Sequence, residues 1–99
     1  MASNISTSLI ISTYNRSDAL EICVKSVLRQ SLLPDEIIIA DDGSKEDTRE
    51  LIHQLAASSE VPIIHVWHED LGFRLASIRN KAIAKASKEY IIQIDGDIV

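Results

Sequence analysis

The chain has 99 residues, of which 45% are hydrophobic and 25% are charged, and this composition is typical of one small globular domain. It excludes a mainly disordered chain and a pair of complete domains. Fifteen acidic residues against ten basic ones give a net charge of −5. The chain as a whole therefore has no positive field that would hold nucleic acid, and we predict no nucleic-acid partner.

Two sequence features bear on where the chain works. Its single cysteine, Cys23, cannot form a disulfide within the chain, which favours a reducing compartment. No apolar run approaches the roughly 20 residues that span a bilayer, and residues 1–8 lack the basic start and apolar core of a signal peptide. We expect a cytoplasmic chain, or the cytoplasmic part of a longer protein that associates with a membrane.

The predicted elements begin with a strand at residues 9–11, a short run of leucine and isoleucine. Apolar residues at helical spacing follow, and they predict a helix over residues 18–30. The apolar stripe of this helix consists of Leu20, Cys23, Val24, Val27 and Leu28. Asp18 and Glu21 have the spacing of a capping box, and Ser17 competes with Asp18 for the cap.

The second and third apolar runs, residues 36–40 and 63–67, predict two further strands, and a proline precedes each. Ser44 is the expected cap of the helix between them. The apolar stripe of that helix consists of Leu51, Ile52, Leu55 and Ala56. A third helix is predicted from Leu75, Ile78, Ala82, Ile83 and Ala86, and it leads to a last strand at residues 90–94.

This alternation predicts an α/β fold of three layers, Rossmann-like, with a mostly parallel sheet of about four strands. The first, second and fourth runs are nearly continuous, which is typical of strands that are covered on both faces. Ligands bind beyond the carboxyl ends of such strands, where the winding direction reverses. If the last strand pairs beside the first, that point lies close to Tyr14, Asp42, Asp95 and Asp97.

Asp95, Gly96 and Asp97 carry the clearest chemistry. Two carboxylates one residue apart at a strand end can approach a hard cation, and glycine between them permits an unusual backbone turn. Mg²⁺ and Mn²⁺ suit such oxygen ligands, and Mg²⁺ is commonly held by one or two carboxylates plus phosphate oxygens. A solvated acidic turn is the alternative explanation of the same three residues.

Asp42 follows an apolar strand directly, beside a second acid, Asp41. A tight turn with Gly43 at positive φ and Ser44 as a helix cap explains the glycine and the serine. It leaves two adjacent acids unexplained. A binding role, in which Asp42 accepts a hydrogen bond from a base or a ribose, explains them better.

Two further residues are candidates for nucleotide binding. Arg79 carries a fork of donors that suits phosphate oxygens, whereas the other basic residues near it can be explained as the wet face of a helix. Tyr14 offers a ring that can stack on a base or pack against the protein. His65 is expected to be a structural histidine within its strand. His68 lies at a strand end without a matching nucleophile, so a hydrolytic triad is unsupported.

Taken in order, these segments resemble the family 2 glycosyltransferases, whose amino-terminal half is a nucleotide-diphospho-sugar binding domain of the GT-A type. The resemblance covers nearly the whole chain. The segments that carry it are residues 9–16, 34–44, 72 with 79–82, and 95–97. Residues 68–74 and 78–80 look most similar to the chondroitin-polymerase and galactosyltransferase-like branches.

The resemblance implies roles for four nucleotide-binding residues. Ser12 and Tyr14 would line the nucleotide pocket. Asp42 would meet the uracil of a UDP-sugar or its ribose, and Arg79 would reach toward the nucleotide.

The resemblance also implies a metal site and a reaction. Asp95 would contact ribose or metal, and Asp97 would ligate the Mn²⁺ or Mg²⁺ that bridges the two phosphates. Family members transfer the sugar to a glycan or another acceptor with inversion, and their general base comes from a segment well beyond the metal motif.

The sequence stops at Val99, two residues after Asp97. We therefore expect residues 1–99 to be the N-terminal nucleotide-sugar-binding part of a glycosyltransferase, without the acceptor-binding part. The general base is expected beyond Val99, so the fragment alone is predicted to be inactive. An uncovered edge on the last strand predicts self-association.

Three alternatives come from other classes. A receiver-like signalling domain that binds Mg²⁺ needs an aspartate at the end of its third strand, where this chain has Trp67 and His68. A sugar-nucleotide pyrophosphorylase needs a glycine-rich basic loop after its first strand, where this chain has residues 13–16. A non-catalytic adaptor is the remaining alternative.

Overall fold

The computed structural model describes residues 6–70, 72 and 74–96. Strands and helices alternate along the chain as predicted. They are β1 (Thr7–Thr13), α1 (Ser17–Leu28), β2 (Glu36–Asp41), α2 (Glu46–Ser58), β3 (Ile63–Trp67), α3 (Leu75–Lys85) and β4 (Tyr90–Asp95). In this part of the chain, no helix has the length and apolar character needed to cross a membrane.

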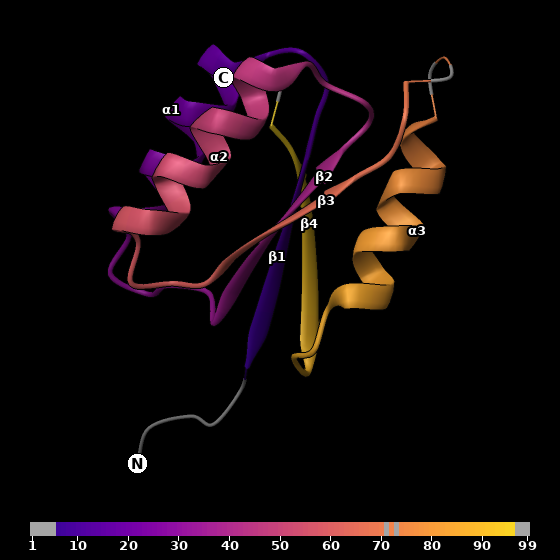
Figure 1. Cartoon of the computed structure of the whole chain (residues 1–99). Coiled ribbons are helices and arrows are strands. Elements are labelled where there is room, and N and C mark those ends of the chain that lie inside the picture. Colours follow the sequence, from indigo (N-terminus) through magenta and orange to yellow (C-terminus); the bar gives the residue numbers. More distant parts are fainter. Residues whose placement is uncertain (1–5, 71, 73, 97–99) are drawn as a thin grey trace.

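The four strands form one parallel sheet in the order β3-β2-β1-β4. Helices α1 and α2 cover one face of the sheet, and α3 covers the other (Figure 1). The predicted three-layer α/β fold is thus confirmed. β4 lies beside β1 on the side away from β2, which is the condition under which the sequence sets the ligand site close to Tyr14, Asp42 and Asp95.

The core has two halves because successive residues of β1 and β2 point to opposite faces of the sheet. On the face of α1 and α2 the strand residues of the core are Leu9, Ile11, Ile37 and Ile39. On the face of α3 they are Ile10, Ile38, Ala40 and Val66, which pack against Ile78 and Ala82. The continuous apolar runs of β1 and β2 are explained by this burial on both faces.

The predicted helix caps are wrong. Helix α1 begins at Ser17 after Arg16, and helix α2 begins after Lys45, and neither preceding residue makes a side-chain capping bond. The hydroxyl of Ser44 instead accepts a hydrogen bond from the backbone N–H of Asn15 at 2.8 Å. The side chains of Ser17 and Ser44 bond to another loop or helix, and Asp18 pairs with Arg16, so none of the three closes its own helix.

The prediction that the fourth run is covered on both faces is also wrong. β4 lies at the edge of the sheet, and Tyr90, Ile91 and Ile92 are 52%, 41% and 51% exposed. Helix α3 packs on β1, β2 and β3. The apolar side chains at the start of β4 are therefore left exposed by the residues that the structure describes. A groove of about 380 Å³ beside it is lined by apolar residues that include Leu33 and Ile94.

A buried carboxylate joins three segments at the amino ends of the strands. Glu36 is 5% exposed, and it accepts hydrogen bonds from the Ser8 hydroxyl at 2.5 Å and the Ser87 backbone N–H at 2.9 Å. Burial raises the pKa of the Glu36 carboxyl, but the bonds from Ser8 and Ser87 outweigh burial, so its net pKa lies below the ordinary value. This carboxylate ties the loop before β4 to the middle of the sheet.

We expect Glu36→Gln to lower the free energy of unfolding at pH 7 by roughly 2 kcal/mol, because hydrogen bonds to a charged group contribute about 1.5–3 kcal/mol. The folded-state pKa is lowered, so this contribution is fully present above the unfolded pKa of about 4.3 and is lost as the pH falls through the folded pKa. Urea denaturation of the native chain and the variant between pH 7 and pH 3 measures both effects. The exposed Glu60→Gln is the matched control, and equal stability of Glu36→Gln and the native chain at pH 7 would contradict the assignment.

Candidate functional site

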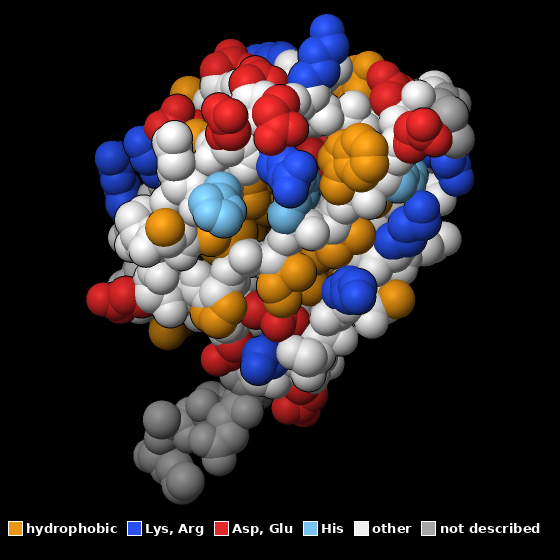
Figure 2. Space-filling model, viewed as in Figure 1, with side chains coloured by type: hydrophobic (Ala, Val, Ile, Leu, Met, Phe, Trp, Pro, Cys, Tyr) orange, Lys and Arg blue, Asp and Glu red, His pale blue; other side chains and the backbone are white. Residues whose placement is uncertain are grey.

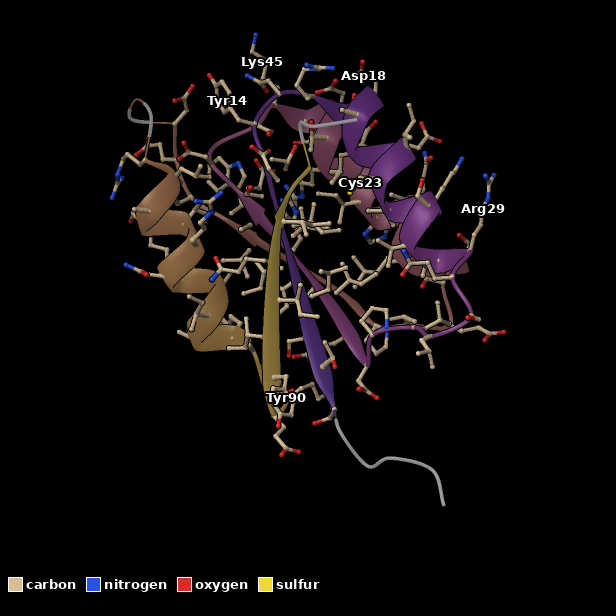
Figure 3. All side chains as sticks on the ribbon, turned by 180° about the vertical axis from the view of Figure 1, so that it is seen from behind. Tyr14, Asp18, Cys23, Arg29, Lys45 and Tyr90 are labelled. Atoms are coloured by element: carbon tan, nitrogen blue, oxygen red, sulfur yellow. The ribbon has the colours of Figure 1, made fainter. Side chains whose placement is uncertain are left out.

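The carboxyl ends of the strands meet the start of α3 at one end of the molecule. Figure 3 shows Tyr14 and Lys45 at this end and Tyr90 at the opposite end. Figure 2 shows acidic side chains gathered at the same end. The site predicted from the sequence therefore lies in an acidic environment.

The loops after β1 and β2 are joined by reciprocal hydrogen bonds. Asn15 donates its backbone N–H to the Ser44 hydroxyl at 2.8 Å, and its side-chain oxygen accepts from the Lys45 N–H at 2.9 Å. Asn15 has a φ of 47°, in the left-handed region that asparagine tolerates better than most residues. This local conformation fixes the loop that carries Tyr14.

Asp41 is a structural carboxylate. Its oxygens contact the His65 Nε2 at 2.8 Å and accept from the Ser44 backbone N–H at 2.9 Å. The Trp67 indole N–H donates to the Ser44 carbonyl at 3.1 Å. The prediction that His65 is a structural histidine is confirmed.

Asp42 is 2% exposed and has a partner for each carboxylate oxygen. One oxygen lies 2.5 Å from the His68 Nε2, and the other accepts from the Arg74 backbone N–H at 2.9 Å. The Lys81 ammonium lies 3.1 Å from the His68 Nδ1. The end of β3 and the start of α3 thus meet at the Asp42 carboxylate, and Lys81 of α3 also contacts the imidazole that holds it.

Gly43 allows the loops after β2 and β3 to touch. Its φ of 88° is the positive value expected from the sequence, and a Cβ at this position would lie 2.6 Å from the backbone of Asp70. Any larger residue would push these loops apart. Gly72 has a φ of 94° as well, but no described residue other than its chain neighbours lies within 4 Å of its hypothetical Cβ.

A cavity of about 110 Å³ lies between these loops, lined by Tyr14, Asp42, Asp70 and Gly72. The Tyr14 hydroxyl donates to Asp70 at 2.8 Å, which holds the half-exposed ring at the cavity. This hydrogen bond and the nearby Asp70 charge raise the pKa of Tyr14 above its ordinary value. Two residues predicted from the sequence, Tyr14 and Asp42, therefore lie at one cavity.

A larger cavity, of about 510 Å³, lies at the edge of β3 and the start of α2. Its lining includes Lys45, Arg49, His65 and Trp67, and it contains none of the residues predicted to bind nucleotide. The smaller cavity is the better candidate because the hydrogen-bonded carboxylate of Asp42 and an aromatic ring converge there.

Ser12 and Asp95 are neighbours in the register of β1 and β4. Ser12 is 2% exposed, and its carbonyl accepts a hydrogen bond from the Gly96 N–H at 2.7 Å. Gly96 is not at positive φ. Its Cβ would lie 2.7 Å from an Ile11 methyl group, so the absence of a side chain at Gly96 lets the end of β4 approach β1 closely. Asp97 lies outside the described residues.

Arg79 is half-buried on α3, and its guanidinium has no hydrogen bond or ion pair among the residues that the structure describes. Its neighbour Lys81, explained from the sequence as wet surface, contacts the buried His68. Sequence reasoning thus missed Lys81 and also His68 as residues of the site. The contact of His68 with Asp42 could have been predicted from the strand ends. Asp41 and Trp67 are partners in the parallel pairing of β2 and β3, so the next residues along the two strands, Asp42 and His68, lie side by side.

One described carboxylate at the tip of β4, that of Asp95, is the kind of oxygen ligand that a hard divalent cation takes. Asp95 supplies carboxylate oxygens there, and Mg²⁺ commonly takes only one or two carboxylates, with phosphate oxygens completing its shell. No group of three or more histidine, cysteine and acidic side chains that could hold a metal occurs within residues 6–70, 72 and 74–96. A cation at Asp95 would therefore depend on ligands from outside this set.

Comparison with known proteins agrees with the geometry. The family described as Glycosyl transferase family 2 matches residues 8–99. Chondroitin synthase from Escherichia coli is 35% identical over 92 residues, which are 92% of this chain and 13% of that protein. The putative teichuronic acid biosynthesis glycosyltransferase TuaG from Bacillus subtilis is 38% identical over 90 residues, which are 91% of this chain and 35% of that protein.

The crystal structure of TarS from S. aureus superposes with a TM-score of 0.74 at 22% sequence identity, over 94% of this chain and 28% of that chain. This likeness confirms the predicted GT-A type of fold. With a match over residues 8–99, the chain belongs to the family 2 glycosyltransferases. Its length is a minor part of the relatives that it matches, 13% and 35% of the two named above. Membership in this family decides against the receiver-like alternative.

We expect Gly43→Ala to destabilise the protein more than Gly72→Ala. Both substitutions force alanine to a positive φ, at a cost of about 1 kcal/mol or more. Only Gly43→Ala adds a clash with the Asp70 backbone. Urea denaturation of the two variants measures the difference, and equal losses of unfolding free energy would contradict the close packing of these loops.

We expect Asp70→Asn to lower the pKa of Tyr14 toward its ordinary value of about 10, because the phenolate then no longer faces a carboxylate. Ultraviolet titration of the tyrosinate in a Tyr90→Phe background isolates Tyr14, since the chain contains two tyrosines. Glu69→Gln, at the exposed neighbouring position, is the control. A titration midpoint that Asp70→Asn leaves unchanged would show that the contact between Tyr14 and Asp70 is absent in solution.

Proposed function

We propose that this chain is the donor-binding part of a glycosyltransferase and that it binds a nucleotide-diphospho-sugar, a UDP-sugar, together with Mn²⁺ or Mg²⁺. Residues 1–99 would be the N-terminal nucleotide-sugar-binding part of the domain. The acceptor-binding part and the general base would lie beyond Val99. In this proposal the longer parent transfers the sugar with inversion in the cytoplasm, and residues 1–99 alone are inactive.

One observation carries the proposal. Family membership covers residues 8–99, and four of the positions that the family resemblance assigns to the nucleotide lie at adjoining carboxyl ends of the strands, namely Ser12, Tyr14, Asp42 and Asp95. Tyr14 and Asp42 line one cavity, and Ser12 and Asp95 are register neighbours. Relatives named chondroitin synthase and validoxylamine A glucosyltransferase, the latter 33% identical over 94 residues, favour sugar transfer over an adaptor role.

The side chains at this end have complementary roles in the proposal. The Tyr14 ring would pack against the base, and Asp42 would accept a hydrogen bond from the uracil or the ribose. Arg79, which has no partner in the described part of the chain, would turn its donors to a phosphate oxygen.

The acidic character of this end supports a role for a cation. A diphosphate would be repelled by the surrounding carboxylates unless positive charge lies between them. Asp95 and Asp97 would hold the divalent ion. When bound, that ion would supply Lewis-acid stabilisation of the departing diphosphate.

The exposed edge of β4 supports a proposal about partners. On the side away from β1 it has no strand neighbour among the described residues, and Ile91 and Ile92 are half-exposed; both are features by which edge strands pair with other chains. Self-association of this chain through β4 is therefore part of the proposal.

Calorimetric titration of the chain with UDP, with and without Mn²⁺, tests the donor site. We expect UDP to bind more tightly in the presence of Mn²⁺. Asp97→Ala should lower that affinity by roughly 10–100-fold or more, because the loss of even a residue that only supports a metal ligand typically has an effect of this size. Glu60→Ala, which removes one exposed charge near the amino end of β3, should bind as the native chain does. Absent binding in a folded sample, or binding indifferent to Mn²⁺ and Asp97, would overturn the proposed donor site.

A further inference from the structure

Asp42 is held by residues from two separate segments, the end of β3 and the start of α3. The His68 Nε2 lies 2.5 Å from one carboxylate oxygen, and the Arg74 N–H donates to the other at 2.9 Å. The side chains of His68 and Asp42 are only 7% and 3% exposed. The carboxylate can therefore rotate only if buried hydrogen bonds break, which is costly where water cannot replace them.

Lys81 determines which nitrogen of His68 carries the proton. Its ammonium, 3.1 Å from the His68 Nδ1, has donors only, so the Nδ1 must accept. A neutral imidazole with an accepting Nδ1 carries its hydrogen on Nε2. The Nε2 therefore donates to Asp42, and Asp42 faces two N–H donors and acts as an acceptor only.

We propose that His68 and Lys81 are positioning residues for donor recognition, which hold Asp42 as a fixed acceptor that selects a hydrogen donor of uridine. This inference rests on the proposed function. The hydrogen donor is either the imide N–H of uracil or a ribose hydroxyl. The cavity of about 110 Å³ at Asp42 is smaller than the roughly 300–1,000 Å³ of a whole ligand site, so it accepts one ring of a nucleotide.

A second pair of the same chemistry provides an internal control. The His65 Nε2 lies 2.8 Å from Asp41, which is only 1% exposed and also accepts from the Ser44 N–H. Both histidines come from β3 or its end, and each satisfies one aspartate at the end of β2. His65, however, lines the larger cavity at the edge of β3 and not the cavity at Tyr14.

The experiment compares nucleotide preference and not affinity alone. The native chain and its variants are titrated by calorimetry with UDP, CDP and 2′-deoxy-UDP, each with Mn²⁺. A preference for UDP over CDP reports a contact with the base, because cytosine lacks the imide N–H. A preference for UDP over 2′-deoxy-UDP reports a contact with the ribose.

His68→Leu should reduce whichever preference the native chain has by about tenfold, the loss expected for one oriented hydrogen bond. His65→Leu should leave it unchanged. His68→Gln should restore much of it, because the glutamine amide N–H can donate to Asp42.

Lys81→Met tests the same arrangement at an exposed position, so the test does not depend on the folding of His68→Leu. It should lower the preference in the same direction, whereas Lys85→Met, one turn further along α3, should not. Equal preferences in the native chain, His68→Leu and Lys81→Met would overturn the inference, as would an equal effect of His65→Leu. Failure of the folded native chain to bind UDP at all would overturn the proposed function and this inference with it.

Discussion

The two adjacent aspartates that end β2 are almost completely withdrawn from water, with 0% and 2% exposure for Asp41 and Asp42. Burial of a carboxylate costs several kcal/mol unless hydrogen bonds replace its hydration. Each aspartate meets this requirement with one histidine and one backbone N–H. The partners come from β3, from the loop after β2 and from the start of α3. The packing of these segments around the site is therefore a consequence of satisfying two buried charges.

The parallel sheet makes this arrangement available. Because β2 and β3 run in the same direction, Asp41 lies opposite Trp67, and the residues that follow each strand emerge side by side. The same geometry sets Asp95 beside Ser12 at the ends of β4 and β1. Acidic side chains thus accumulate at one end of the molecule (Figure 2). A negatively charged ligand would be repelled by these carboxylates unless positive charge compensates for them. For this reason the proposed function includes both a divalent cation and a basic residue of α3.

The fold was largely predictable from the sequence, whereas the site was predictable only in outline. Apolar periodicity located the elements because burial on one or two faces of an element leaves a direct signature in the chain. It located β4 as well, but it was wrong about the burial of β4, since an apolar run does not reveal which other residues cover the strand. The contact of Lys81 with His68 was not predictable, because it joins α3 to the end of β3 and depends on the angle at which α3 crosses the sheet. In the sequence, a lysine at an exposed helical position has the same pattern whether or not it makes such a contact.

The two ends of the sheet differ in what a substitution there can reveal. At the amino end, Glu36 joins Ser8 and Ser87, and no residue assigned to nucleotide binding is present. A change there acts on stability alone. At the carboxyl end, the bonds that satisfy Asp42 also shape the cavity that Asp42 lines, so substitutions of its partners alter stability and binding together. Absolute affinity is therefore ambiguous at this end. In a ratio of affinities for two nucleotides, the free-energy cost of a destabilised fold cancels, and only the difference in how the cavity binds the two nucleotides remains. His65→Leu is the matched control, because His65 bonds Asp41 and does not line the cavity at Tyr14.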